Sequence, residues 1–181
     1  NLSGHVIVVG YGRVGRMLGS LLEGLQVPHI GLDRDAGLVA RYRQTGTGIF
    51  YGDASRVHLL RKFGADQAAA LVVTMDNPHV AEQVVHNARR NWPQLLIYAR
   101  ARDNAHAARL IDRGASHVIP EIVEASLQLG EMVLSGVGVP METARRVIEL
   151  RRQAEQPGTV QETPPRPSAD GDDTPGAPGT P

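Results

Sequence analysis

The sequence predicts an α/β fold in which helices cover both faces of one parallel sheet. Three observations predict it. Short runs of β-branched residues alternate with helical stretches of about ten to fifteen residues, a glycine-rich turn follows the first run, and acidic side chains follow the next three runs. At 181 residues the chain has room for one well-buried domain with some extra elements, rather than for two domains.

Six runs are expected to be strands, and six strands would complete a doubly wound sheet of Rossmann type. The expected strands are residues 5–9, 28–32, 48–51, 70–74, 95–99 and 117–119. The expected helices between them are residues 14–22, 36–43, 55–63, 78–91 and 105–113. Gly46, Gly64 and Gly114 each follow one of these helices, where a left-handed cap is needed.

Two further helices are expected after the sixth strand, separated near Gly138 and Pro140. The first has more apolar surface than one face can bury within a single Rossmann unit. Its apolar residues are Ile122, Val123, Leu127, Leu129, Met132, Val133 and Leu134. An exposed apolar helix needs a partner, so we expect a homodimer through it. The alternative is that this helix packs back on its own sheet.

The chain therefore divides into three parts. Residues 1–120 are expected to form a Rossmann nucleotide-binding domain, and residues 121–155 to form the C-terminal dimerisation helices. Residues 156–181 are rich in proline and glycine and contain no aromatic residue, so we expect a disordered tail. The acids of this tail outnumber its one base, Arg166, which leaves the rest of the chain mildly basic.

Composition excludes several classes of function. The absence of cysteine excludes disulfides, thiolate catalysis and thiolate metal sites. Bases do not alternate with aromatic residues, so no nucleic-acid partner is expected. There is no signal peptide and no apolar run of about 18 residues or more, so this stretch is not expected to cross a membrane. It begins at Asn1 without a methionine, which suggests a fragment of a longer protein.

A GxGxxG motif directly follows the first expected strand and directly precedes the first expected helix. Its residues are Gly10, Tyr11, Gly12, Arg13, Val14 and Gly15. Gly10 would permit the tight turn, Gly12 would let the backbone approach a diphosphate, and Gly15 would allow close packing of helix on strand. The first N–H groups of the helix would then face the phosphates.

Asp33 ends the second expected strand, eighteen residues beyond Gly15. A carboxylate there can accept both ribose hydroxyls, which favours NAD(H), AMP or ATP over NADP because it would repel the 2′-phosphate. The adjacent Arg34 weakens that exclusion slightly. The alternative interpretation of Asp33 is an ordinary helix N-cap.

Two more strands end in side chains that would project over the same carboxyl edge of the sheet. Asp53 and Ala54 follow the third strand, and Met75 and Asp76 follow the fourth. Both aspartates are expected to cap the helices that follow them. Asp53 and Ala54 are also expected to line the adenine pocket.

The fifth strand ends in Arg100 and Arg102, which with Arg13 suit an anionic ligand or a charge switch. The alternative is that the arginines form salt bridges with nearby acids, namely Asp103, Glu121 and Glu124.

Catalytic and metal-binding motifs are weak. His79, Glu82 and His86 share one helical face, but without a fourth ligand a solvated face is the preferred interpretation, so no metal is expected. There is no GxSxG elbow, Walker lysine or paired nucleophile and base. A hydride-transferring dehydrogenase would need a substrate domain, for which the chain has little room. An enzyme is therefore not expected.

Four segments together resemble the RCK (TrkA-N, KTN) domains, most of all the C-terminal regulatory domain of Kef-type and plant-type potassium/proton antiporters. They are HVIVVGYGRVGRMLGSLL, LDRD, FYGDASRVHLLRKFGA and LLIYARARDNAHAARLIDRGASHVIPE. The resemblance covers residues 5–153, and SLQLGEMVLSGVGVP resembles the helix that crosses over between protomers in those dimers.

The resemblance implies specific roles for site residues. Tyr11 to Gly15 would hold the phosphates, Asp33 the ribose, Asp53 and Ala54 the adenosine region, and Arg100 the phosphate side of the nucleotide. Kef-type domains also bind glutathione or its adducts near the dimer interface. The candidates for that regulatory ligand here are Arg102 and Asn104.

The resemblance also implies a partner and a place. A transmembrane potassium/proton antiporter domain would lie upstream on the same chain or in an associated subunit, at the cytoplasmic face of the inner membrane. Nucleotide occupancy would shift a dimer between two arrangements and so bias the transporter. The alternatives are a stand-alone RCK subunit of a Trk/Ktr-type potassium uptake system and a small NAD-dependent oxidoreductase.

Overall fold

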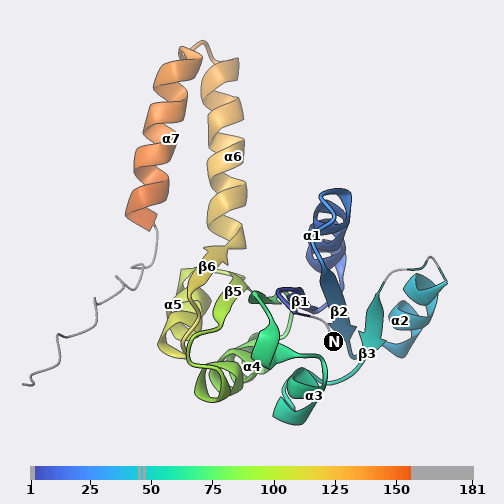
Figure 1. The fold of residues 1–181 in the computed structure, drawn as a ribbon. Coiled ribbons are helices and arrows are strands. Elements are labelled where there is room, and N and C mark those ends of the chain that lie inside the picture. The colour runs from blue at the N-terminus through green and yellow to red at the C-terminus, as the bar shows by residue number, and fades with distance from the viewer. Residues whose placement is uncertain (1–2, 45, 47, 156–181) are drawn as a thin grey trace, which may run out of the picture.

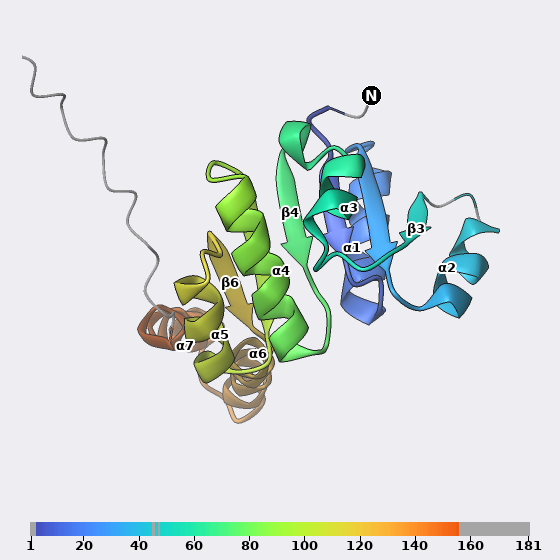
Figure 2. The same cartoon turned by 90° about the horizontal axis from the view of Figure 1, so that it is seen from below.

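The computed structural model describes residues 3–44, 46 and 48–155; the predicted disordered tail, 156–181, lies outside the described residues. One six-stranded parallel sheet lies between helices (Figures 1 and 2). Its strand order is β3-β2-β1-β4-β5-β6, which confirms the predicted Rossmann-type sheet. The strands are β1 (Val6–Val9), β2 (His29–Asp33), β3 (Ile49–Tyr51), β4 (Ala70–Val73), β5 (Leu96–Ala101) and β6 (His117–Pro120).

Seven α-helices and one short 3-10 helix, η1 (Ala65–Gln67), occur in the described ranges. The α-helices are α1 (Arg13–Gly24), α2 (Ala36–Arg43), α3 (Val57–Lys62), α4 (Pro78–Asn91), α5 (Asn104–Asp112), α6 (Glu121–Gly136) and α7 (Met141–Glu155). Each expected strand and helix is present, with ends that differ by at most two residues from the expected ones. Strand β5 extends to Ala101, beyond its expected end, because it pairs with β6 as far as Pro120.

The larger part of the core lies on the face of the sheet that α3, α4 and α5 cover. Ile7 and Val9 of β1 point to this face and pack in one cluster with Leu71 and Ile97 of the neighbouring strands. Val84 of α4 belongs to the same cluster and is fully buried. Alternate residues of each strand reach this face, as the two-residue period of a strand requires.

The opposite face is only half covered. Val8 and Ile49 pack there with Val39 of α2 and with partly buried leucines of α1. These two helices cover β3, β2 and β1. Over β4, β5 and β6 no helix of the described chain lies on this face. Side chains that remain half-buried or exposed there are Val72, Leu96, Tyr98, His117 and Ile119. A groove of 930 Å³ lies along this part of the sheet, between α1 and α6.

Helices α6 and α7 form a hairpin that projects from the β6 edge of the sheet (Figure 1). Gly138, with φ of +93°, turns the chain between them, close to the predicted break. Ion pairs join the two helices, from Arg145 to Glu131 at 3.2 Å and from Arg152 to Glu124 at 3.1 Å. None of the helices in the described ranges combines the length and the apolar composition needed to cross a membrane.

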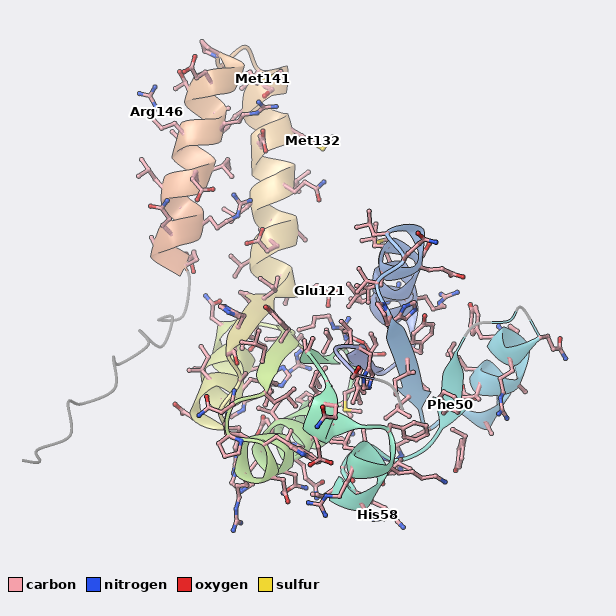
Figure 3. All side chains as sticks on the ribbon, viewed as in Figure 1. Phe50, His58, Glu121, Met132, Met141 and Arg146 are labelled. Atoms are coloured by element: carbon pink, nitrogen blue, oxygen red, sulfur yellow. The ribbon has the colours of Figure 1, made fainter. Side chains whose placement is uncertain are left out.

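Most of the apolar surface of α6 is uncovered in the single chain. Leu127 is buried, whereas Leu129 is 63% and Met132 69% exposed. Figure 3 shows Met132 on the side of α6 that faces away from α7. The alternative that this helix packs back on its own sheet is therefore wrong, because the hairpin leaves the sheet at its first residue, Glu121.

The expected left-handed caps are present. Gly46 and Gly64 have φ of +79°, and Gly114 has φ of +104°. These values lie in the region that glycine adopts without a steric penalty, so each glycine ends its helix as predicted.

A buried polar cluster lies between α4 and α5. The ring of His106 is 2% exposed, and its Nδ1 accepts the Arg102 backbone N–H at 3.2 Å. Burial, followed by the nearby Arg109 charge, holds the pKa of His106 below its usual value. Glu82 is 8% exposed and accepts the Arg109 Nε–H at 2.8 Å, which lowers the pKa of its carboxyl. The interpretation of this helix face as solvated is thus wrong for Glu82, because Arg109 neutralises the carboxylate and allows its burial.

His106 should make stability depend on pH. Its folded pKa is below 6.5, so protons bind the unfolded chain more readily, and stability is complete above that value and falls as pH decreases. We expect His106→Asn, which keeps an acceptor for the Arg102 N–H but does not titrate, to flatten the fall in Tm between about pH 7 and pH 5. Tm measured across this range checks the prediction. The exposed His58, replaced by Gln, is the control and should leave the slope unchanged.

Candidate functional site

The turn between β1 and α1 has the geometry that its glycines predict. Gly10 has φ of +87°, and a Cβ atom there would lie 2.8 Å from the Met75 backbone nitrogen. A Cβ on Gly15 would lie 2.1 Å from the Gly10 carbonyl oxygen, so only glycine lets α1 approach the end of β1. By contrast, a Cβ on Gly12 would meet nothing within 4 Å. Gly12 is the N-cap of α1 and has no side chain to occupy the first N–H groups, which stay available to an anion.

The ring of Tyr11 points away from this turn and into the core. It is 3% exposed, and burial raises the pKa of its hydroxyl. A Cβ on Gly19 would lie 1.9 Å from the Tyr11 hydroxyl, and one on Gly31 would lie 2.6 Å from its Cδ2. These two glycines of α1 and β2 thus make room for the ring. Tyr11 contributes its backbone to the site, and its side chain fixes the turn from behind.

Asp33 holds two loops together at the end of β2. Its Oδ2 accepts the Tyr11 N–H at 2.6 Å, and its Oδ1 accepts the Asp35 N–H at 2.8 Å. The alternative that Asp33 caps a helix is wrong, because Asp35 is the N-cap of α2 and accepts the Leu38 N–H at 3.0 Å. Each carboxylate oxygen of Asp33 has a further lone pair, so it can accept a ligand hydroxyl as well.

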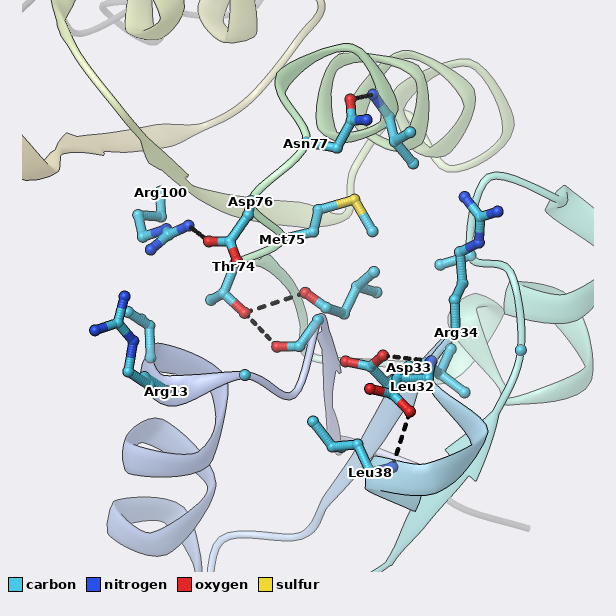
Figure 4. Close-up of a pocket in the computed structure, with 18 residues that line it drawn as sticks. Arg13, Leu32, Asp33, Arg34, Leu38, Thr74, Met75, Asp76, Asn77 and Arg100 are labelled. Atoms are coloured by element: carbon cyan, nitrogen blue, oxygen red, sulfur yellow. Dashed lines mark hydrogen bonds and ion pairs between the residues drawn. The ribbon is translucent and has the colours of Figure 1, made fainter. Parts of the chain in front are cut away.

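A pocket of 340 Å³ lies at the carboxyl ends of β1, β2 and β4 (Figure 4). Most of the residues expected to bind the cofactor line it. They are Gly10, Gly12, Arg13, Val14, Asp33, Arg34, Ala54, Met75 and Arg100. Tyr11, Gly15 and Asp53 do not line it; the first two shape the turn from behind. Arg13 and Arg100 lie on one side of the pocket and Arg34 on the other (Figure 4).

The sequence did not reveal two apolar residues of this pocket, Leu38 of α2 and Val80 of α4. With Leu32 and Met75 they provide an apolar part of the lining, suited to a flat base. Each lies in the first turn of its helix, so its position follows from how the helix enters the sheet. In the sequence, only the spacing of Leu38 and Val80 from the acids and amides that end β2 and β4 could have indicated that they line the pocket.

The helix-capping roles expected of Asp53 and Asp76 are wrong. Asp53 Oδ1 instead accepts both the backbone N–H and the hydroxyl of Ser55, at 3.1 and 2.7 Å. The Ser55 hydrogen bond lowers the pKa of Asp53. Helix α4 is capped by Asn77, whose Oδ1 accepts the Val80 N–H at 3.2 Å, and Asp76 pairs with Arg100 instead. Because Asn77 lies one residue closer to α4 and accepts this N–H, Asp76 is not needed as the cap.

Arg100 forms ion pairs with two acids from different parts of the chain. One guanidinium nitrogen contacts Asp76 in the loop after β4, and another donates to Glu121, the first residue of α6, at 3.0 Å. The expected partner Glu121 is thus confirmed, whereas Glu124 pairs with Arg152. The Arg100 side chain is 18% exposed.

The two residues proposed for a regulatory ligand lie just beyond Arg100. Arg102 is largely exposed and its Nε is 3.5 Å from Asp103, the acid expected as an alternative partner. The Asn104 amide donates to Glu155 at the end of α7 at 2.9 Å, and the Asn104 Oδ1 is buried with no partner among the described residues. No group of three or more histidine or acidic side chains suited to a metal ion occurs in the described part of the chain.

The sheet order, the glycine turn and Asp33 define a Rossmann-type nucleotide-binding fold. The TrkA-N domain family matches residues 6–121, which is more than half of the chain, and the protein belongs to that family.

Proteins of potassium efflux systems are similar to this chain. The glutathione-regulated potassium-efflux system protein KefC of Klebsiella pneumoniae is 38% identical over 149 residues, which cover 82% of this chain and 24% of KefC. K(+) efflux antiporter 2, chloroplastic, of Arabidopsis thaliana is 34% identical over 152 residues, which cover 83% of this chain and 13% of the antiporter. The chain thus spans a quarter or less of these relatives.

A solved structure is similar over nearly its whole length. The Kef CTD of Shewanella denitrificans in its AMP-bound form is 33% identical, with a TM-score of 0.74, and the match covers 83% of this chain and 92% of that one. Both the sheet domain and part of the hairpin must match to reach this coverage, because residues 6–121 alone make up a smaller share.

Two glycine substitutions should separate the packing of the turn from its ligand surface. We expect Gly15→Ala to lower the free energy of unfolding by at least about 2 kcal/mol, since its Cβ would overlap the Gly10 carbonyl. Gly12→Ala should leave stability nearly unchanged. Urea unfolding of both variants checks this, with Gly24→Ala, whose Cβ also meets open space, as the control in the same helix. Equal losses for Gly12→Ala and Gly15→Ala would contradict the assigned geometry.

Proposed function

We propose that the pocket binds an adenine nucleotide and that the chain is a regulatory domain which reports nucleotide occupancy to a potassium efflux antiporter. The observation that carries the proposal is the preformed cradle of glycine turn and Asp33, in a chain similar to a Kef CTD in its AMP-bound form. The candidate nucleotides are AMP, ATP and NAD(H). Asp33 disfavours NADP, whose 2′-phosphate would lie against a carboxylate.

The pocket offers each part of an adenine nucleotide a suitable surface. Leu38 and Val80 provide the apolar lining for the base, and Asp33 provides acceptors for the ribose hydroxyls. The uncapped first turn of α1 presents N–H groups to phosphate, with the positive end of the helix dipole. Arg13 and Arg100 add two cations on the same side.

Binding without catalysis is the function that these groups support. The acids that line the pocket are already engaged: Asp33 and Asp35 accept backbone N–H groups, and Asp76 pairs with Arg100. No histidine, tyrosine, lysine or serine of the described chain lines the pocket. It therefore lacks a placed general acid or base for proton or hydride chemistry.

The similarity to efflux proteins points to the partner. The relatives are potassium efflux proteins several times longer than this chain, so the module would serve a transmembrane antiporter domain, upstream on the same chain or in an associated subunit. Its place would be the cytoplasmic face of the inner membrane. We favour the hypothesis of an efflux antiporter over that of a stand-alone subunit of an uptake system, since the efflux proteins match both the sheet domain and the hairpin.

We further propose a homodimer formed through residues 121–155, with residues 1–120 as the nucleotide-binding domain. The exposed apolar side chains of α6 need a cover, and the half-covered sheet face offers an apolar groove of 930 Å³ beside it. A second copy would cover the α6 side chains and fill the groove at once, because each hairpin could lie over the groove of the other chain in a closed twofold arrangement. Nucleotide binding would shift such a dimer between two arrangements.

Glutathione is the candidate for a second regulatory ligand, since KefC is a glutathione-regulated system. Asn104 and Arg102 are the residues proposed to contact it. The buried Asn104 Oδ1 has no partner among the described residues and could accept an amide N–H, while Arg102 is free to pair with a carboxylate once it leaves Asp103.

Calorimetry tests the nucleotide site. We expect AMP, ATP and NADH to bind, and NADPH to bind at least about tenfold more weakly because Asp33 repels its 2′-phosphate. Gly12→Ala should weaken binding of all four nucleotides, since its Cβ would occupy the approach of the phosphate. Gly24→Ala is the matched control. Binding that Gly12→Ala leaves unaltered would place the phosphate elsewhere.

Catalysis is tested with NADH and a panel of carbonyl compounds. We expect no turnover, because the pocket has no placed acid or base. The absorbance of NADH measures turnover. A measurable kcat would favour an oxidoreductase instead.

Sedimentation tests the dimer. We expect Met132→Asp to yield monomers at concentrations where the unchanged chain is dimeric, because a carboxylate would be buried without a partner in the interface. Tyr51→Asp, at a similarly exposed position on the opposite edge of the sheet, should remain dimeric. A dimer that survives Met132→Asp would show that α6 does not form the interface.

A further inference from the structure

Arg100 belongs to the walls of two hollows at once. It lines the 340 Å³ pocket and also the 930 Å³ groove that lies between α1 and α6. Val14 and Thr74 are the other residues common to both walls. Of the three, only Arg100 carries a charge, and its two ion pairs run in different directions, toward Asp76 at the pocket and toward Glu121 at the start of α6.

The helical hairpin is tied to the sheet domain at the same place. Three polar contacts join the two parts in the described chain, and all three come from the segment that runs from the end of β5 to the first residue of α5. Arg100 pairs with Glu121, the Arg102 carbonyl accepts the Ile122 N–H at 3.3 Å, and Asn104 donates to Glu155. Glu121 and Ile122 begin α6, and Figure 3 shows Glu121 at the base of the hairpin. The segment 100–104 therefore sets how the hairpin leaves the sheet.

The present partners of Arg100 are easy to exchange. Asp76 is 93% exposed and Glu121 53% exposed, so water can solvate either carboxylate once it is released. A phosphate over the first turn of α1 carries up to two charges and three acceptor oxygens, and it would lie on the Arg13 and Arg100 side of the pocket. Asp76 and Glu121 already take N–H groups from both terminal nitrogens of the guanidinium, so a phosphate that pairs with Arg100 competes with the two carboxylates for these donors.

We propose that Arg100 is the positioning residue that couples the nucleotide pocket to the hairpin: nucleotide phosphate draws its guanidinium away from Glu121 and so releases the first turn of α6. The inference rests on the proposed nucleotide site and adds the route by which occupancy reaches the hairpin. It requires phosphate, so adenosine fills the base and ribose positions without moving α6.

Coupling of this kind is reciprocal, so substitutions of its two partners should change ADP affinity in opposite directions. Glu121 competes with phosphate for Arg100, so Glu121→Gln strengthens ADP binding, by about fivefold. Arg100→Gln removes a charged donor and weakens ADP binding by about tenfold. In the double variant the Glu121 substitution has no further effect, because its partner is gone. Damage to the fold would instead weaken binding in every variant.

Calorimetry with ADP and adenosine measures these effects on the unchanged chain, the two single variants and the double variant. Glu131→Gln is the matched control, since Glu131 also lies on α6 and pairs with an arginine, Arg145, but does not contact Arg100. It should leave ADP affinity unchanged. Adenosine affinity should be the same in all these proteins.

Hydrogen exchange followed by NMR provides a second readout, at the Ile122 amide that bonds to the Arg102 carbonyl. Saturating ADP should speed exchange of this amide in the unchanged chain, saturating adenosine should not, and Arg100→Gln should abolish the response. Weaker or unaltered ADP binding by Glu121→Gln, or an Ile122 amide that ignores ADP, overturns the coupling while the nucleotide site stands. If the unchanged chain binds neither ADP nor adenosine, the proposed function itself fails and the coupling falls with it.

Discussion

The carboxylate of Asp33 is the contact on which the rest of the site depends. One of its oxygens holds the Tyr11 N–H and the other holds the Asp35 N–H, so the glycine turn after β1 and the entry to α2 are fixed relative to each other. A backbone hydrogen bond from the Gly10 N–H to the Leu32 carbonyl, at 2.9 Å, supports the same junction. The ring of Tyr11, seated against Gly19 and Gly31, secures the same turn from the core side. The result is an open first turn of α1 next to a carboxylate with spare acceptor capacity.

The uneven cover of the sheet is what separates this chain from a self-sufficient Rossmann unit. Helices α3, α4 and α5 cover one face, but on the other face α1 and α2 reach only β1, β2 and β3. The chain leaves the sheet at Glu121 instead of returning over β4 to β6, and so exposes apolar surface on both the sheet and the hairpin. Because Arg100 stands at the junction of pocket, groove and hairpin, an event in the pocket is close to the hairpin, which three polar contacts join to the sheet domain in the described chain.

Prediction from sequence worked where a residue's role is local. The strands and helices follow from hydrophobic period, and the roles of Gly10 and Gly15 follow from a turn that must reverse tightly and let α1 approach β1. It was less successful for acids near helix starts. Asp53 and Asp76 have the right spacing for caps, yet Ser55 and Arg100 engage their carboxylates, and Asn77 caps α4 instead. Local spacing cannot rank competing donors that come from other parts of the chain.

The amino-acid sequence by itself determined the α/β class, the phosphate-type turn, the acid at the end of β2 and the surplus of apolar residues on α6, because each depends on neighbours within a few positions along the chain. Only the tertiary structure decided that Tyr11 faces the core, that Leu38 and Val80 join the pocket, and that Arg100 pairs with Asp76 and Glu121. These features arise where strands distant in sequence end at one edge of the sheet. Their distances are set by sheet order and helix direction, which sequence spacing does not contain.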